Sequence, residues 1–213
     1  MISYLRIYKT VFCLVSCVML SIHVFSQEGT SLIKAQFGLG ICNLAKDGFV
    51  QSFEGKSVNF PSVNLALQYM FKPQLGGKLD YNFSRISNEE NTPSFKLNYS
   101  RINTLLVYDA NNILNFLPPR AGVFFHVGPG FTFVKPLGNY TQNKVSFLNI
   151  MGGAEFHYGI SDKLSIYTDV SYVNGFGKAF NPLSDGLGSF NGNILTITFG
   201  ASISLSGCYF CDQ

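Results

Sequence analysis

The sequence predicts an all-β protein, an eight-stranded antiparallel up-and-down transmembrane β-barrel. Eight segments alternate between apolar and polar residues, and each has about the length of a tilted membrane-spanning strand, ~9–11 residues or slightly more. Their polar faces carry mainly small uncharged residues, and the connections between them alternate between short and long. No segment after the N-terminal region has the period of an amphipathic helix.

The first 26 residues form a predicted secretory signal peptide. Arg6 and Lys9 provide a basic start, Thr10–Phe25 is an apolar run, and modest side chains precede a cleavage point before Gln27. Processing at Cys17 as a lipoprotein is the alternative, but the apolar run continues well beyond this cysteine. The sequence thus predicts three parts: a signal peptide at 1–26, the barrel at 27–206 and a periplasmic tail at 207–213.

The composition argues against disorder and against nucleic-acid binding. Charged residues make up 13% of the chain and aromatic residues 15%, which is too apolar for a disordered protein. Because residues 1–26 contain two bases and no acid, their removal lowers the formal net charge from +3 to +1. No basic patch is then available for nucleic acid. The expected partner is outer-membrane lipid, for which the apolar strand faces described below are the reason.

The predicted strands follow one another in the order of the chain. The first four read SLIKAQFGLGIC (31–42), SVNLALQYMF (62–71), LGGKLDYNFSRI (75–86) and SFKLNYSRINTLLVY (94–108). The last four read AGVFFHVGPGFTFV (121–134), VSFLNIMGGAEFHYG (145–159), KLSIYTDVSYVN (163–174) and NILTITFGASISLS (193–206). In the fourth strand the alternation changes near Arg101, and in the fifth Pro129 has no N–H to donate, so we expect a bulge at each place.

The two faces of these strands predict which face meets lipid. In the third strand Leu79, Tyr81 and Phe83 alternate with Asp80 and Asn82. A soluble barrel or sandwich exposes many lysines and glutamates on its polar face, whereas here that face is small and sparsely charged, as a narrow interior requires. The apolar faces end in tyrosine and phenylalanine, which is typical of membrane interfaces. We therefore expect the apolar faces to point outward into lipid.

The connections predict the orientation of the barrel. The links at 72–74 and 160–162 are tight, and the link at 109–120 is longer and contains two prolines. The opposite set, including 43–61 and 175–192, is mostly long and polar or glycine-rich. Short turns on one side and long loops on the other are typical of outer-membrane barrels, with the turns and both chain ends in the periplasm.

Several stretches resemble the barrel domain of OmpA-type outer-membrane proteins. They are SVNLALQYMFKPQLGGKLDYNF, HVGPGFTFVK, MGGAEFHYGISDKLSIYTDVSY and GNILTITFGASISL. The last also resembles the family's terminal insertion signal, which implies recognition by the barrel-assembly machinery; its positions are Thr198, Gly200, Ile203 and Leu205. The resemblance does not extend to the family's C-terminal peptidoglycan-binding domain, and SGCYFCDQ follows the signal where such signals usually end the chain.

Several charged residues are predicted to face the interior. They are Lys34, Lys78, Asp80, Arg101, Glu155 and Asp169, with His157 as a further member. A buried charge is costly unless it is paired, so we expect these acids and bases to pair with one another as a polar plug. The alternative is that they gate an ion path.

His126 and His157 raise the possibility of a lipid hydrolase. Thr132 and Ser146 are candidate hydroxyl partners for the first histidine, and Glu155 is two residues from the second. No nucleophile motif such as G-x-S-x-G is present, and both histidines are predicted to point inward, away from lipid substrates. We expect no enzyme activity, no metal and no cofactor.

The CxxC spacing of Cys208 and Cys211 also predicts no redox or zinc site. No βαβ pattern surrounds these cysteines and no second pair is present, so we interpret them as a pair of tail thiols or a local disulfide.

The sequence therefore predicts a non-enzymatic barrel in the outer membrane of a Gram-negative bacterium. Its expected role is envelope integrity or surface interaction through its loops, whose partner the sequence does not identify. Eight strands leave an interior that side chains can fill, so at most a small pore is expected. The alternatives are a small solute or ion channel of the porin kind, a lipid-modifying outer-membrane enzyme, and a soluble lipocalin-like binding barrel.

Overall fold

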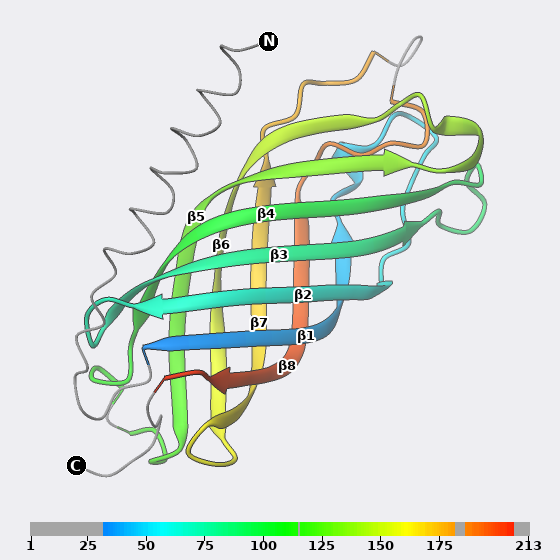
Figure 1. The fold of residues 1–213 in the computed structure, drawn as a ribbon. Helices are drawn as coiled ribbons and strands as arrows, with labels where there is room; N and C mark the ends of the chain where they lie inside the picture. Colours follow the sequence, from blue (N-terminus) through cyan, green and yellow to red (C-terminus); the bar gives the residue numbers. More distant parts are fainter. Residues whose placement is uncertain (1–31, 115, 182–185, 207–213) are drawn as a thin grey trace, which may run out of the picture.

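The chain forms a closed barrel of eight antiparallel strands, each paired with its neighbours in sequence, and β1 with β8 (Figure 1). This computed structural model describes residues 32–114, 116–181 and 186–206. The strands are β1 (Ile33–Leu44), β2 (Asn59–Met70), β3 (Leu75–Ser87), β4 (Lys96–Asp109), β5 (Ala121–Pro136), β6 (Val145–Gly159), β7 (Leu164–Gly175) and β8 (Ile194–Ser204). The predicted fold class is confirmed. The proposed signal peptide, Cys208 and Cys211 lie outside the described residues.

The two helical segments that the structure describes are single 3-10 turns, Lys46–Gly48 and Gly138–Tyr140. Within the described ranges, no helix has the length and apolar character needed to cross a membrane.

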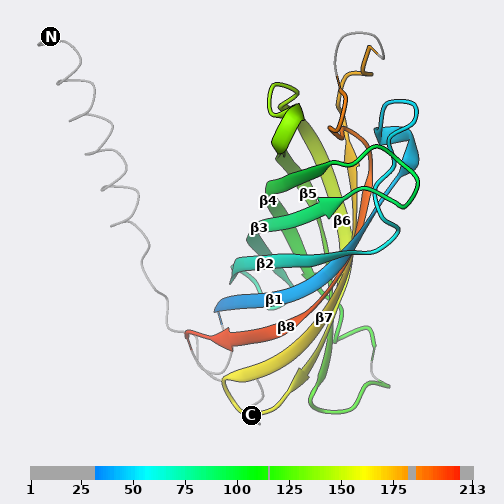
Figure 2. The ribbon, with the colours of Figure 1, turned by 90° about the vertical axis from the view of Figure 1, so that its right-hand side faces the viewer.

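The connections divide the barrel into two ends, which we call the loop end and the turn end. Loops 45–58, 88–95 and 137–144, together with the described parts of loop 176–193 (176–181 and 186–193), gather at the loop end, at the upper right of Figure 1. Connections 71–74, 110–120 and 160–163 lie at the turn end, where β1 begins and β8 ends. Figure 2 shows the tilt of the strands between these two ends. The sequence predicts short turns at one end of the barrel and mostly long loops at the other, and the observed connections have this arrangement.

The strand registers correct two predictions. The β3–β4 ladder continues past Arg101 without a shift, and the β5–β6 ladder continues through Pro129 opposite Ile150. On its other side the β4–β5 ladder lacks its pairs at Gly128 and Pro129 but keeps its register. Neither place has the register shift of a bulge, and the shift that does occur lies between Gly40 and Cys42. The apparent change of alternation in β4 has another cause: its inward face is apolar at both ends and polar only in the middle.

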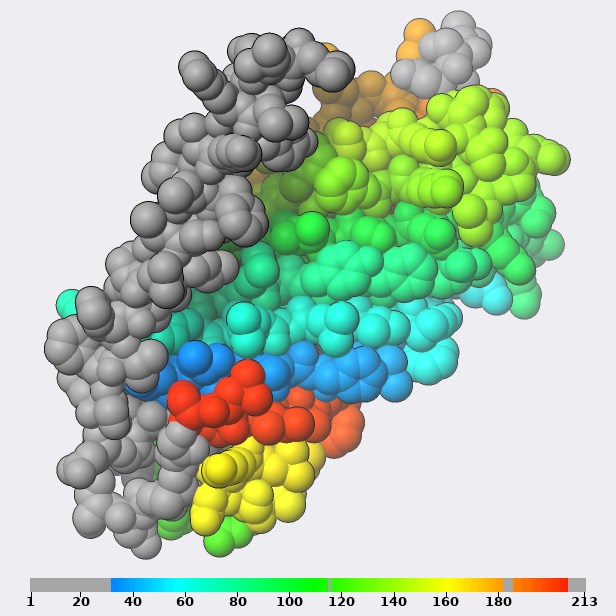
Figure 3. All heavy atoms as spheres, in the orientation of Figure 1, coloured from blue at the N-terminus to red at the C-terminus, as the bar shows by residue number. Residues whose placement is uncertain are grey.

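The outer wall exposes an apolar band, which we call the outward band. Each strand contributes large side chains to it; one from each is Phe37, Leu67, Leu79, Ile102, Phe133, Ile150, Tyr172 and Phe199. In the space-filling view, the side chains of β8, β1, β2 and β3 cover adjacent stripes of this wall (Figure 3). The parity prediction of an outward apolar face is therefore correct.

The interior is polar in the middle, mixed at the turn end, where Val107 and Phe124 lie beside polar side chains, and apolar toward the loop end. Buried side chains there form one cluster, which we call the loop-end cluster: Cys42, Leu44, Phe53, Ile86, Phe95, Leu97, Tyr99, Leu105, Val134, Phe147, Met151, Val173, Phe190 and Ile194. Phe53, Phe95 and Phe190 come from loops rather than strands, and Phe49 and Tyr140 pack against the cluster. All four loops thus fold inward to close this end.

Candidate functional site

All six charged residues predicted to face the interior are buried there. Lys78 on β3 forms an ion pair with Glu155 on β6, across the barrel. Arg101 Nη1 lies 2.7 Å from Asp80 Oδ1, joining β4 to β3. Asp169 on β7 pairs with His126 on β5 at 2.7 Å. Lys78, Glu155, Arg101 and Asp80 thus form ion pairs, and Asp169 bonds to a histidine, because strands that alternate in parity place these side chains in one narrow space.

Lys34, the sixth residue, lies near the turn end of the interior. Its Nζ is 4.5 Å from the centre of the Phe124 ring, a cation–π contact. The edge of the same ring packs against His157, with ring centres 5.0 Å apart. Lys34 is therefore held against an aromatic wall in the layer that also contains His157.

Neutral side chains complete the polar network. Gln36 Nε2 donates to Glu155 Oε2 at 3.0 Å, and Asn64 Nδ2 donates to Asp80 Oδ2 at 2.7 Å. Toward the loop end, Asn103 Nδ2 donates to Asn149 Oδ1 at 2.6 Å, and Asn149 Nδ2 donates to Thr132 at 2.9 Å. This chain of amides leads directly to the loop-end cluster, so bonded side chains fill the space between the charges and the apolar plug.

The sequence did not identify the partners of His126. Its expected neighbours were Thr132 and Ser146, but Thr132 bonds to Asn149 and Tyr99, and Ser146 faces outward. The actual partners are Asp169 and Ser171 on β7, which is two strands away in the barrel order. Alternation predicts that His126 points inward, but it carries no information about which strand its side chain reaches.

Two serine–histidine–acid groups occur in the interior. In a catalytic triad the serine contacts one nitrogen of the histidine ring and the acid contacts the other. Here Ser171 and Asp169 both contact Nε2 of His126, at 3.5 and 2.7 Å, so this group does not have the triad arrangement. His157 lies between Ser165, 3.3 Å from Nδ1, and Glu155, 2.8 Å from Nε2.

The second group resembles a hydrolase relay, but its setting is unsuited to hydrolysis. Its acid is already paired with Lys78, and Ser165 lies on a strand paired on both sides, where backbone N–H groups serve the ladders rather than an oxyanion.

The same region contains a group of possible metal ligands. Donor atoms of His126, Glu155 and Asp169 lie within 4.8 Å of one another. These atoms already bond to protein donors: Lys78, Gln36 and His157 surround Glu155, and Ser171 bonds Asp169. Acids and bases therefore balance one another here, and we assign no metal to the group.

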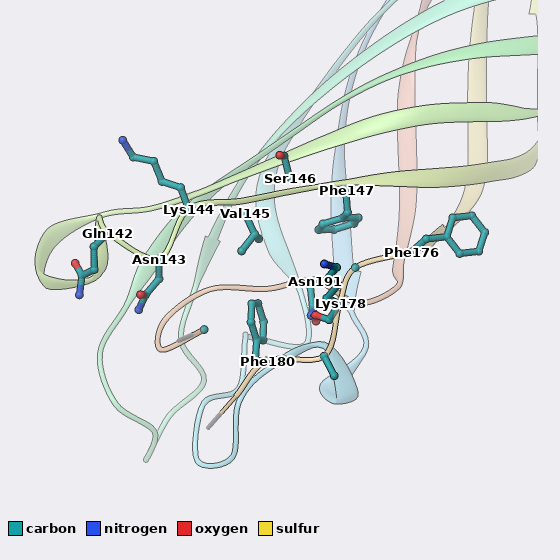
Figure 4. Close-up of a pocket in the computed structure, with 13 residues that line it drawn as sticks. Gln142, Asn143, Lys144, Val145, Ser146, Phe147, Phe176, Lys178, Phe180 and Asn191 are labelled. Atoms are coloured by element: carbon teal, nitrogen blue, oxygen red, sulfur yellow. The ribbon is translucent and has the colours of Figure 1, made fainter. Parts of the chain in front are cut away.

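A cleft between loops lies at the loop end (Figure 4). It encloses about 450 Å³ between the segments 142–147 and 176–180, with Gly186 and Asn191 on its edge. Phe147, Phe180 and Asn191 turn toward the cleft, whereas Lys144 extends away from it at the rim. Asn143 Nδ2 donates to the carbonyl of Leu187 at 2.8 Å, which links the two loops.

The four residues of the predicted insertion signal lie on two faces of β8 and its end. Thr198 and Gly200 face inward, whereas Ile203 and Leu205 are exposed on the outer wall. Gly200 pairs with Gly38 on one side and with Tyr167 on the other. This position therefore has a packing role in the barrel, in addition to its predicted role in recognition.

Loops 45–58 and 88–95 are joined by hydrogen bonds on the exposed surface. The backbone N–H groups of Glu90 and Ser57 donate to the Glu89 carboxylate, at 3.0 and 3.2 Å, and lower the pKa of Glu89. Lys46 bonds to Glu54 at 2.8 Å, which raises the pKa of Lys46. The loop end is thus cross-linked on its surface as well as packed inside.

Comparisons with known proteins find similar folds among solved structures. No protein-family model and no curated protein matches the chain. Among solved structures, the chain resembles Ail, the attachment invasion locus protein of Yersinia pestis, in complex with the heparin analogue sucrose octasulfate. The identity is 16% and the TM-score 0.52, over 83% of this chain and 99% of that one. It also resembles Neisserial surface protein A, at 11% identity and a TM-score of 0.56, over 84% and 100%.

These likenesses concern the fold and span nearly the whole of both known proteins. Together with the closed eight-strand topology, they bear out the OmpA-type resemblance found in the sequence. The chain has the transmembrane β-barrel fold of eight-stranded outer-membrane proteins.

Proposed function

We propose that this chain is a non-enzymatic barrel in the outer membrane of a Gram-negative bacterium, contributing to envelope integrity or to surface interaction. Its outward band contacts lipid, its loop end faces the cell surface and its turn end faces the periplasm. The barrel-assembly machinery inserts it by reading the β8 segment with Thr198, Gly200, Ile203 and Leu205. The observation that carries the proposal is a barrel that is apolar outside and filled inside.

The outward band supports lipid over water as the surroundings. Large apolar side chains exposed on all eight strands are unfavourable in water and favourable in lipid, whereas the buried charges of the interior pair with one another. A lipocalin-like barrel requires the opposite arrangement, with an apolar interior around its ligand and charges outside.

The experiment that tests this proposal is electrophoresis of outer-membrane extract, unheated and boiled in SDS. We expect the protein in the outer-membrane fraction, with a mobility that changes on boiling, because a closed barrel resists cold SDS. A single unshifted band in the soluble periplasmic fraction contradicts the proposal and favours the soluble binding barrel.

The absence of catalysis is tested separately. We expect no esterase or deacylase activity from purified protein in detergent with acyl-ester lipids. Activity that disappears in His157→Ala or Ser165→Ala overturns the non-enzymatic assignment, and His126→Ala is the matched control from the other histidine group.

The loop cleft supports surface interaction as the more specific role. Lys178 lies on its rim with Lys144, whose side chain extends outward beside the opening, and its walls contain asparagine amides and phenylalanine rings. These groups suit an anionic saccharide bound across the rim. Ail has been crystallised with a heparin analogue, so sucrose octasulfate is the first probe to use. We expect calorimetric binding that Lys144→Glu/Lys178→Glu abolishes and Lys72→Glu, at the turn end, leaves intact. If the wild type, the double variant and Lys72→Glu bind sucrose octasulfate equally, the cleft is not the binding site.

A further inference from the structure

The turn that joins β4 to β5 has an unusual surface for a periplasmic connection. Phe116 is 80% exposed and Ile113 is 66% exposed. The turn is nevertheless tied to the barrel: Asn111 Oδ1 accepts from the Val123 N–H at 2.8 Å, and the Ala110 N–H donates to the Val123 carbonyl at 3.0 Å. Two large apolar side chains are thus exposed on a turn whose first residues are hydrogen-bonded to β5.

The same turn helps to form a groove on the outer wall. The groove encloses about 280 Å³ at the turn end of β5 to β8. Leu117 from the turn lines it together with outward side chains of the strands: Val123, Phe156, Tyr158, Ile166 and Phe199. Its lining is therefore mainly apolar, and it is continuous with the outward band through Phe156 and Phe199.

We propose that Ile113 and Phe116 insert into the periplasmic leaflet of the membrane, and that the groove beside Leu117 holds one acyl chain of a phospholipid from that leaflet. The inference rests on the proposed membrane location. Continuity with the outward band identifies the occupant, because a groove in a lipid-facing wall is filled by what surrounds that wall. Arg120, which is exposed between the lining residues Leu117 and Ala121, supplies a cation for the lipid phosphate.

The chain contains no tryptophan, so a single introduced tryptophan reports on one position. Phe116→Trp is reconstituted in phosphatidylcholine vesicles with and without bromine on the acyl chains. Phe133→Trp on the outward band is the lipid-exposed control, and Asn139→Trp on an exposed loop is the water-exposed control. We expect brominated lipid to quench Phe116→Trp as strongly as Phe133→Trp, with little quenching by aqueous acrylamide.

The controls separate failure of this inference from failure of the proposed function. If bromine quenches Phe133→Trp while Phe116→Trp behaves like Asn139→Trp, the turn lies in water and the insertion is wrong, although the membrane location stands. If bromine quenches none of the three, the proposed membrane location is wrong as well.

The groove is tested by native mass spectrometry of protein extracted from phospholipid vesicles. We expect the wild type to retain one phospholipid, and Thr168→Phe, which fills the groove, to lose at least 90% of it. Thr104→Phe is the control: it makes the same change on the exposed face of β4, outside the groove, and we expect this variant to retain the phospholipid. Equal retention by both variants, or no retained lipid in the wild type, overturns the groove assignment.

Discussion

At the scale of single residues, Gly200 shows that one position can serve both packing and the predicted assembly signal. A Cβ atom added to Gly200 would lie 2.8 Å from Tyr167 Cε1, and one added to Gly38 would lie 2.7 Å from the Tyr167 hydroxyl. The two glycines pair with each other and leave room for this ring, which stacks on His157 at 5.3 Å. Glycine is therefore required here for steric reasons.

We expect Gly200→Ala to destabilise the folded barrel by about 1–3 kcal/mol, because the added methyl group would meet the Phe37 carbonyl oxygen, and Gly38 Cα at 2.7 Å, in addition to the Tyr167 ring. Urea unfolding of protein refolded in vesicles measures this without any assembly machinery. Gly77→Ala is the control, since a Cβ there meets its nearest atom at 4.0 Å. If Gly200→Ala lowers insertion in cells but leaves urea unfolding unchanged, the residue acts through recognition alone.

The buried pair Lys78–Glu155 leads to a second prediction at this scale. Glu155→Gln leaves the lysine charge without its partner, so we expect a loss of about 3–5 kcal/mol. Lys78→Met/Glu155→Gln removes both charges, and we expect it to cost less than the sum of its single variants. A double-mutant cycle of urea unfolding in vesicles measures this coupling.

Lys46→Met, in the exposed pair with Glu54, is the control for this cycle and leaves unfolding unchanged. Strict additivity of the two interior substitutions contradicts the role of the Lys78–Glu155 pair.

At the scale of elements, the strands were predictable because alternation depends on local sequence. Eight strands with the correct outward faces follow from a period of two, and their predicted bounds differ from the observed ones by only a few residues. The expected bulge at Arg101 is wrong, because the change of alternation comes from an inward face that is apolar at both ends of β4. At Pro129 the missing N–H leaves a gap in the β4–β5 ladder, but the register does not shift. In β4, Leu97 and Tyr99 face inward to join an apolar cluster that the sequence did not indicate.

The candidate site was predictable only in part. The six interior charges follow from parity, but their partners depend on cross-strand geometry that a single sequence does not contain. The loop-end cluster was missed for a similar reason. Phe53 and Phe190 lie in long polar or glycine-rich loops, where nothing local distinguishes a buried aromatic residue from an exposed one.

The contact between loops 45–58 and 88–95 is predicted to depend on pH. Backbone N–H donors lower the pKa of Glu89 in the folded protein, so the ionised contact is present at neutral pH and is lost as the pH falls through that lowered value. We expect the amide resonances of Ser57 and Glu90 to titrate together in NMR spectra, with a midpoint below the ordinary value of about 4.3.

Glu89→Gln removes this titration, and Glu90→Gln is the control because it keeps the Glu89 carboxylate. A midpoint at or above the ordinary value contradicts the contact.

At the scale of the whole molecule, buried side chains line the interior of the described barrel from one end to the other. The charges, the amide chain and the loop-end cluster occupy successive levels from the turn end to the loop end. Eight strands enclose only enough space for side chains, so no residual lumen is needed for the fold. The buried charges and the loop-end cluster support our proposal of at most a small pore.

We expect no steady conductance from the wild-type protein in planar bilayers. Phe190 is 0% exposed in the loop-end cluster, so Phe190→Ala removes part of the plug and is expected to produce intermittent openings and a loss of about 3–5 kcal/mol in stability. Phe176→Ala changes an aromatic residue of the same loop that is 62% exposed, and it serves as the control. Steady channels in the wild type would establish the small-channel alternative.

The loop-end cluster also determines where this protein can change during evolution. Surface loops usually tolerate substitution freely, but each of these four loops contributes an aromatic residue to a shared plug: Phe53, Phe95, Tyr140 and Phe190. A change at any of these positions disturbs the other three loops. We therefore expect changes of binding specificity to be tolerated best at loop positions between these anchors, and substitutions of the anchors to destabilise the loop end.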